Sequence, residues 1–328
     1  MPDLEFADEP TLLTGGFFTE NYAFTLRGAP AGEWARPLVL RLFPPHVPLE
    51  QARRESVVQQ ALAAQGFPAP RVPLVGDTAE PFGKLWLIME RMPGAAMLGD
   101  IGIGQLLPML PTLARTAAVL ADLLARLHAT QPDAVVDALG EHAAGIGRWT
   151  DSLERAETEM PGFARGAQWL LANQPVPREP LTICHGDLWP GNVLVEKRRV
   201  TAVIDYSVAT VAEPALDIGF CVMPFRIVPV PLPRALRAFA LSVGRRAGDR
   251  IAKRYATATG RDLTNQPYYE AMRVALELQN VYRWRTATAA GDDPGFPRPT
   301  WDIAADRMIA HFRAISGVDL ALPPPVSG

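Results

Sequence analysis

The chain has 328 residues, of which 48% are hydrophobic and 20% are charged, a composition typical of a folded globular protein and not of a disordered or fibrous one. Its net charge of −3 argues against a protein whose main task is to bind nucleic acid, because such proteins usually carry a basic excess. It has two cysteines, no apolar stretch long enough to span a membrane and no signal-peptide pattern, so we expect a cytoplasmic protein with no nucleic-acid, membrane or obligate protein partner.

The segment from residue 12 to residue 91 predicts a small β-sheet with one helix. Alternating aromatic, β-branched and aliphatic residues, with Gly and Pro at the turns, indicate the strands. These strands are expected at residues 12–14, 22–26, 38–43, 71–75 and 85–89. The helix is expected at residues 49–65, because its apolar residues from Val57 to Leu62 fall on one face and Gly66 marks its end.

After Pro93-Gly94 the pattern becomes mostly helical. Helices are expected at residues 112–129 and 151–173, and more helices follow residue 213. Residues 193–206 predict a β-hairpin, since two apolar runs flank a charged turn, and residues 320–328 predict a loose tail. The sequence therefore indicates an α+β protein with a small mostly-β lobe, a hinge near residues 90–94 and a larger mostly-α lobe.

One segment carries most of the chemistry: Cys-His-Gly-Asp-Leu-Trp-Pro-Gly-Asn at residues 184–192, followed by Ile-Asp-Tyr at residues 204–206. Asp187 and Asn192 lie five residues apart on a predicted loop, which can direct both side chains into one cleft. Oxygen ligands from Asn192 and Asp205 suit Mg²⁺, a hard cation that also binds phosphate. Asp187 then remains outside the metal's ligands and can accept a proton from a hydroxyl group, which is the division of roles that phosphoryl transfer needs.

The pattern His-Gly-Asp-x-x-x-x-Asn followed by Ile-Asp-aromatic resembles the aminoglycoside phosphotransferase family, whose relatives include choline kinases and macrolide kinases. These small-molecule kinases share the protein-kinase-like fold. Four other segments resemble the family's nucleotide loop, its glutamate-bearing helix, its hinge and the segment whose aspartate supports the catalytic loop. They are Gly15-Gly16 with Asn21, Arg53-Arg54-Glu55, Met89–Gly94 and Glu213–Asp217. The resemblance implies a two-lobed fold, with residues 1–92 as the nucleotide-binding lobe and residues 93–328 as the catalytic and acceptor-binding helical lobe.

The resemblance also implies a role for each matching residue. Asp187 is expected to orient and deprotonate the acceptor hydroxyl, and Asn192 and Asp205 to hold Mg²⁺. His185 and Asp217 are expected to support the catalytic loop. ATP or GTP is expected to contact a group of residues in the first lobe: Gly15, Gly16, Arg41, Glu55 and the backbones of Glu90 and Met92.

Arg41 is a departure from the family pattern, because relatives often carry a phosphate-binding Lys at this strand position. No Lys precedes Lys84, so a shifted alignment within the strand does not supply one. An arginine can still bridge Glu55 and the phosphates, since its planar fork suits both partners. Nucleotide affinity is the property that this departure puts in question.

The implied function is an ATP- or GTP-dependent transfer of the γ-phosphoryl group to a hydroxyl of a small molecule. An alternative is a nucleotide-binding regulatory protein of the same fold without transferase activity. A protein kinase is disfavoured, because no activation segment is evident between Asp205 and Glu213. Residues 220–290 contain twelve basic and four acidic residues. This surplus does not favour a polycationic acceptor, so a neutral, anionic or apolar hydroxyl compound fits at least as well.

Overall fold

The structure is a computed structural model that describes residues 4–13, 19–45, 47–76, 78–98, 106–231, 233–295 and 298–324. Its contacts divide the chain into two compact units. The first unit comprises Met1–Gly99, Thr130–Ala144 and Trp189–Val211, and the second comprises Asp100–Ala129, Gly145–Leu188 and Ala212–Gly328. The lobe boundary at residues 92–93 stays a prediction, and the units instead group the hairpin after Asn192 with the N-terminal segment.

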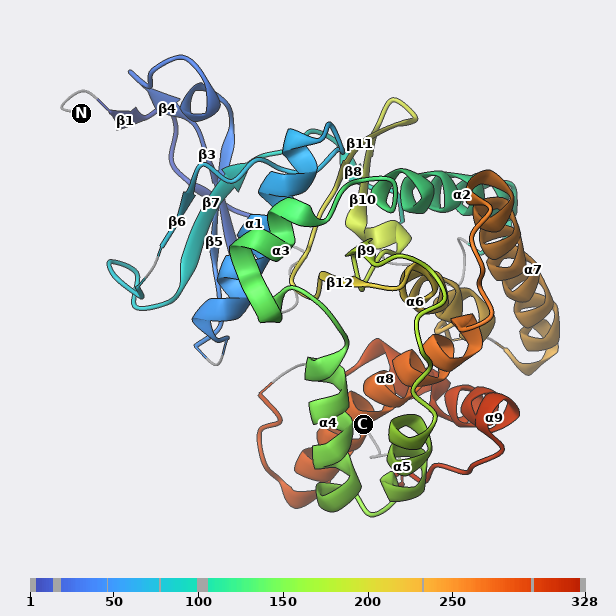
Figure 1. The fold of residues 1–328 in the computed structure, drawn as a ribbon. Helices are drawn as coiled ribbons and strands as arrows, with labels where there is room; N and C mark the ends of the chain where they lie inside the picture. Colours follow the sequence, from blue (N-terminus) through green and yellow to red (C-terminus); the bar gives the residue numbers. More distant parts are fainter. Residues whose placement is uncertain are drawn as a thin grey trace. The chain divides into compact units, whose positions relative to one another are not determined.

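The first unit contains a five-stranded antiparallel sheet in the order β2-β3-β5-β7-β6 (Figure 1). Its strands are β2 (Thr11–Leu12), β3 (Glu20–Phe24), β5 (Leu38–Leu42), β7 (Trp86–Glu90) and β6 (Leu74–Val75). Helix α1 (Leu49–Ala64) is followed by Gln65 at its C-cap and then by Gly66, whose φ of 78° suits a glycine. The buried side chains of Phe43, Ala52, Val72 and Leu87 form a core between helix and sheet. This core fixes β5 relative to α1, the two elements that carry Arg41 and Glu55.

A second sheet in the same unit has the order β11-β10-β8. It consists of β8 (Ala95–Ala96), β10 (Val193–Glu196) and β11 (Arg199–Val203). Lys197 and Arg198 join β10 to β11 with φ angles of 47° and 68°, the backbone of a two-residue type I′ turn. The predicted hairpin is therefore present. The remaining elements of this unit are β1 (Glu5–Phe6) paired with β4 (Leu26–Arg27), η1 (Glu33–Ala35), α3 (Asp133–Leu139), η3 (Gly140–His142) and η4 (Pro190–Asn192).

The second unit is mostly helical. Its helices are α2 (Leu106–Leu127), α4 (Gly147–Glu159), α5 (Ala164–Ala172), α6 (Pro214–Ile227), α7 (Arg234–Thr259), α8 (Gln266–Ala290), η5 (Thr300–Ala304) and α9 (Ala305–Ser316). It also contains the short strand β9 (Thr182–Cys184) and the end of β12 (Thr210–Ala212), a strand that begins in the first unit. Helix α6 is buried over most of its length and packs against α7 and α8 (Figure 1). Within the described ranges, none of the helices combines the length and the apolar character that a membrane span requires.

The structure corrects two of the sequence predictions. The single helix expected at residues 151–173 is two helices, α4 and α5, because Pro161-Gly162 interrupts it. A Cβ at Gly162 would lie 2.3 Å from the carbonyl oxygen of Ala321, and the Ala321 N–H donates to the Gly162 carbonyl at 2.9 Å. The described part of the expected loose tail is thus held against this break, and Leu320 is buried.

Candidate active site

Arg41 lies between two carboxylates in the first unit. Its Nη1 is 3.3 Å from Glu55 Oε1 on α1, and its Nη2 donates to Asp205 Oδ1 at 3.1 Å. Burial alone would lower the pKa of Arg41, but Glu55 and Asp205 together raise it, so the guanidinium stays charged. The fork of the arginine thus links the helix glutamate to the aspartate after β11, an arrangement that the sequence analysis expected only for Glu55.

Glu55 is fully buried, and its environment disfavours the charged form. Burial raises the pKa of Glu55 to about 7, although Arg41 acts to lower it. Gln59 Nε2 donates to Glu55 Oε1 at 3.3 Å. The other oxygen, Oε2, is buried without a hydrogen-bond partner among the described residues. The ionised carboxylate therefore depends on the neighbouring Arg41.

We expect Arg41→Met to destabilise the protein by about 3–5 kcal/mol near pH 8, because it leaves a buried carboxylate without its cation. The pKa of Glu55 is already raised, and losing Arg41 raises it further, so the folded variant binds a proton that the unfolded chain releases. The destabilisation should therefore shrink as the pH falls below the folded pKa toward 4.5, the ordinary pKa of a glutamate. Urea unfolding at about pH 8.5 and about pH 6 measures this difference.

The matched control for this prediction is Arg71→Met, which removes the partner of Glu33. Both side chains of that pair are about half exposed, at 51% and 45%, so we expect little change in stability at either pH. An Arg41→Met variant that loses the same stability at both pH values would show that Glu55 is not the titrating group.

Asn192 and Asp205 lie near each other because of the hairpin. The Ile204 N–H donates to the Asn192 carbonyl at 2.9 Å, and Val193 pairs with Val203 in the sheet. Asp205, the next residue, has a φ of 66°, a left-handed conformation that Asp tolerates better than most residues. A carboxamide and a carboxylate are hard oxygen donors, so this pair fits Mg²⁺ better than a metal that prefers sulfur or nitrogen.

The hinge segment lies in the same unit as these residues. The Glu90 N–H donates to the Arg71 carbonyl at 2.8 Å, and the Glu90 side chain accepts from Arg36 at 2.5 Å. Within the described ranges, the Met92 backbone makes no hydrogen bond to another backbone group. Gly94 packs against the Val195 carbonyl, where a Cβ would lie 2.6 Å away. The two remaining residues predicted to bind nucleotide, Gly15 and Gly16, lie outside the described residues.

The part of the predicted catalytic loop that precedes Trp189 lies in the second unit, where Asp217 of α6 holds its backbone. Asp217 accepts from the N–H groups of His185 and Gly186, both at 2.7 Å. Gly186 has a φ of 76°, which favours glycine. The Asp187 N–H donates to His185 Nδ1 at 3.2 Å. The three residues predicted from the sequence, His185, Asp187 and Asp217, thus form one hydrogen-bonded group.

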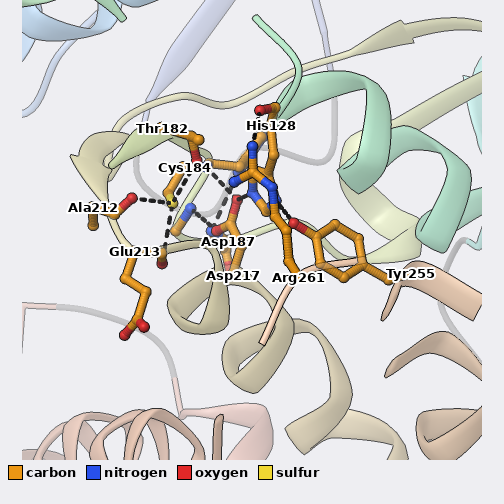
Figure 2. Close-up of polar contacts among 11 residues, drawn as sticks. His128, Thr182, Cys184, Asp187, Ala212, Glu213, Asp217, Tyr255 and Arg261 are labelled. Carbon is orange, nitrogen blue, oxygen red and sulfur yellow. Dashed lines mark hydrogen bonds and ion pairs between the residues drawn. The ribbon is translucent and has the colours of Figure 1, made fainter. Parts of the chain in front are cut away.

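Asp217 belongs to a buried polar network. His128 Nε2 lies 3.1 Å from Asp217 Oδ2, and His128 Nδ1 lies 2.8 Å from the Tyr255 hydroxyl (Figure 2). An ionised carboxylate only accepts, so Nε2 carries the proton of this bond. Burial alone would raise the pKa of Asp217, but the hydrogen bonds and charges of the histidines and the Gly186 N–H lower it overall. The network therefore favours an ionised Asp217.

Cys184 lies beside this network, and the ligand atoms of His128, Cys184 and Asp217 are within 4.8 Å of one another. These residue types bind metals, but Asp217 and His128 are already engaged in hydrogen bonds. Burial raises the pKa of the Cys184 thiol well above its usual range, which disfavours the thiolate that a metal needs. Hydrogen bonding accounts for this cluster without a metal.

The sequence analysis missed Arg273, which contacts the predicted catalytic loop, and Glu277, which pairs with Arg273. Arg273 Nη2 donates to Asp187 Oδ1 at 2.7 Å and lies 2.7 Å from Glu277 Oε1. Both residues lie on α8, within the segment that the sequence analysis described only by its basic surplus. Nothing local to Arg273 distinguishes it from the other arginines of this helix, so only the packing of α8 identifies it.

The predicted site residues that the structure describes fall into two groups, each within one unit. The first unit holds the group expected to bind nucleotide and metal: Arg41, Glu55, Glu90, Met92, Asn192 and Asp205. The second unit holds His185, Asp187 and Asp217. The chain passes from one unit to the other at Leu188–Trp189, between the predicted base and the predicted metal ligand Asn192.

Comparison with known proteins agrees with the family resemblance that the sequence motifs indicated. The profile of the family described as "Phosphotransferase enzyme family" (APH) matches residues 11–273. Acyl-CoA dehydrogenase family member 10 of Mus musculus is 30% identical over 265 residues, which are 76% of this chain and 24% of that protein. The chain thus spans about a quarter of the length of this relative.

Two solved structures share the fold. A candidate aminoglycoside phosphotransferase from Ralstonia eutropha has a TM-score of 0.66 and 22% identity, over 96% of this chain and 95% of the other. A thermostable mutant of aminoglycoside phosphotransferase APH(4)-Ia, in a ternary complex with ADP and hygromycin B, has a TM-score of 0.58 and 17% identity, over 95% and 94% of the two chains. The likeness confirms the predicted α+β, protein-kinase-like fold class, and with the profile match it shows that the chain belongs to the APH phosphotransferase family.

Proposed function

We propose that this protein transfers the γ-phosphoryl group of ATP or GTP to a hydroxyl of a small molecule. The observation that carries the proposal is the support given to Asp187, whose loop backbone donates two hydrogen bonds to the buried Asp217. A general base must be held within reach of the hydroxyl whose proton it accepts. The two bonds hold the backbone directly before Asp187 and so restrict where its carboxylate lies.

The phosphate groups are assigned to the first unit. Asn192 and Asp205 would hold Mg²⁺, and Arg41 would contribute a fixed positive charge beside Asp205. Bound Mg²⁺ would supply charge neutralisation for the phosphate oxygens. Arg41 and Glu55 would replace the usual lysine–glutamate pair, and the guanidinium retains its charge at any pH that the enzyme meets.

The nucleotide is assigned to the hinge. The backbone of Met92 has no competing backbone partner within the described ranges, so it is able to bond a purine edge, together with the Glu90 carbonyl. The solved relative in complex with ADP supports a nucleotide substrate for this fold. The matched region covers only 24% of the acyl-CoA dehydrogenase relative, so we propose no dehydrogenase chemistry for this chain.

The acceptor is proposed only as a small-molecule hydroxyl. The basic surplus of residues 220–290 gives less information about the acceptor than the sequence analysis assumed, because several of its arginines form ion pairs within the unit. Those pairs join Arg226 to Asp249 and Glu270, Arg254 to Asp122, Arg273 to Asp187 and Glu277, and Arg285 to Asp302.

The test is a coupled assay of ADP or GDP release, with and without Mg²⁺, against a panel of acceptors. The panel contains aminoglycosides, macrolides, choline-like amines, sugars and amino-alcohols. We expect one acceptor class to stimulate Mg²⁺-dependent release. Nucleotide binding by calorimetry without release by any member of the panel would instead favour a regulatory nucleotide-binding protein.

A further inference from the structure

Arg273 lies in the middle of α8 and contacts both the side chain and the backbone of the catalytic loop. Its Nη2 donates to Asp187 Oδ1 at 2.7 Å, and its Nη1 donates to the Gly186 carbonyl at 3.3 Å. The same Nη2 is 2.7 Å from Glu277 Oε1, one helical turn further along α8. The Arg273 side chain is only 16% exposed. One largely buried guanidinium therefore connects the loop to α8.

The close packing of α8 against α6 brings Arg273 to the loop. A Cβ at Gly219 of α6 would lie 2.9 Å from the backbone nitrogen of Glu270, so the two helices approach closely at this point. The Arg273 guanidinium lies over the ring of Phe220, 5.3 Å from its centroid. Asp217, two residues before Gly219, holds the backbone of the loop. The same helix pair thus holds the loop backbone and the Asp187 side chain.

The two neighbouring carboxylates keep the buried Arg273 guanidinium charged. Burial alone would lower the pKa of Arg273, but Glu277 and Asp187 together raise it, so the guanidinium remains charged. Burial raises the pKa of Glu277, and Arg273 acts against this rise. A planar guanidinium binds two carboxylates in fixed directions, which an ammonium group does not. Buried ion pairs contribute little net stability, so a role in orienting Asp187 explains the arrangement better than stability does.

We propose that Arg273, anchored by Glu277, is a positioning residue that fixes the Asp187 carboxylate in the orientation needed to deprotonate the acceptor hydroxyl. The inference rests on the function proposed above. Arg273 acts through Asp187, and the nucleotide residues lie elsewhere in the chain. A displacement of about 1 Å in such a group costs roughly 100-fold in rate.

The first test is a set of substitutions with kcat and KM measured for nucleotide and acceptor. Arg273→Met is expected to lower kcat about 100-fold with both KM values nearly unchanged. Arg273→Lys is expected to recover part of kcat, because an ammonium group can reach one of the two carboxylates. Glu277→Gln keeps a hydrogen-bond acceptor for Arg273 and is expected to lower kcat less than Arg273→Met does.

The matched control is Arg285→Met on the same helix, about 18 Å further along its axis. Arg285 is also buried, and its Nε donates to Asp302 Oδ1 at 2.7 Å. We expect Arg285→Met to lower Tm as Arg273→Met does, while kcat stays near that of the wild type. Equal losses of kcat in these two variants would reduce Arg273 to a structural role and overturn the proposal.

The second test is a double-mutant cycle with Asp187→Asn. If Arg273 acts through Asp187, adding Arg273→Met to Asp187→Asn should change kcat little, because the carboxylate that it orients is gone. Multiplicative losses would overturn the proposal, and so would a rise in acceptor KM at unchanged kcat. Absence of transfer by the wild-type protein would defeat the proposed function itself, whereas an Arg273→Met variant that keeps the kcat of the wild type would defeat only this inference.

Discussion

Asp187→Asn is expected to lower turnover about 10²- to 10⁴-fold, the range that a positioned general base contributes. Asparagine preserves the size of the side chain and its bond with Arg273, but its amide cannot accept the proton of an acceptor hydroxyl. Nucleotide affinity should change little, because the residues assigned to the nucleotide lie on other elements. Steady-state kinetics and calorimetry with a non-hydrolysable nucleotide measure the two effects separately.

Asp122→Asn is the matched control for this prediction. Asp122 also pairs with an arginine, Arg254 at 2.7 Å, but both side chains are about half exposed. The control should keep the turnover and stability of the wild type. Turnover by Asp187→Asn equal to that of the control would remove Asp187 from the role of base.

Asp217→Asn is expected to cost about 2–4 kcal/mol of folding free energy and to lower turnover as well. Each Asp217 oxygen accepts a backbone N–H, so an asparagine NH₂ group would face a donor on one side. The pKa of Asp217 is lowered in the folded protein, so its stabilisation is present above the unfolded value near 3.8 and is lost as the pH falls through the folded pKa. Denaturant unfolding from neutral to acidic pH should show the two proteins converging.

Asp249→Asn serves as the control for Asp217→Asn. Asp249 pairs with Arg226 at 3.0 Å, but its side chain is 68% exposed. Its loss should leave stability and turnover nearly unchanged. If Asp217→Asn were as stable as Asp249→Asn and fully active, the loop would not depend on Asp217.

The sequence predicted the parts of the fold and site that depend on local pattern. The helix at residues 49–64 and the hairpin of β10 and β11 follow from periodicity and turn chemistry, and both lie within a few residues of their expected bounds. The loop from His185 to Asn192 was found because its residues are adjacent in the chain. Asp217 was identified by resemblance alone, and its two backbone hydrogen bonds supply the physical reason for that position.

The features that the sequence did not predict depend on contacts between distant segments. The break between α4 and α5 has a local cause, Pro161-Gly162, but the return of the chain to this break at Ala321 depends on a distant contact. Arg273, with Glu277 as its partner, reaches Asp187 because α8 packs closely against α6 at Gly219. Counting charges over residues 220–290 treated every arginine alike, although several form ion pairs with carboxylates of the same unit. Propensity and motif spacing do not contain such information.

The most direct test of the central claim is phosphorus NMR of the wild-type protein with ATP, Mg²⁺ and the acceptor that stimulates ADP release. We predict that the γ-phosphorus signal decreases while a phosphate monoester of the acceptor grows at the same rate as ADP, and that the monoester grows at least about 100-fold more slowly with Asp187→Asn. Growth of inorganic phosphate alone, or of phosphate attached to protein, would contradict a small-molecule phosphotransferase.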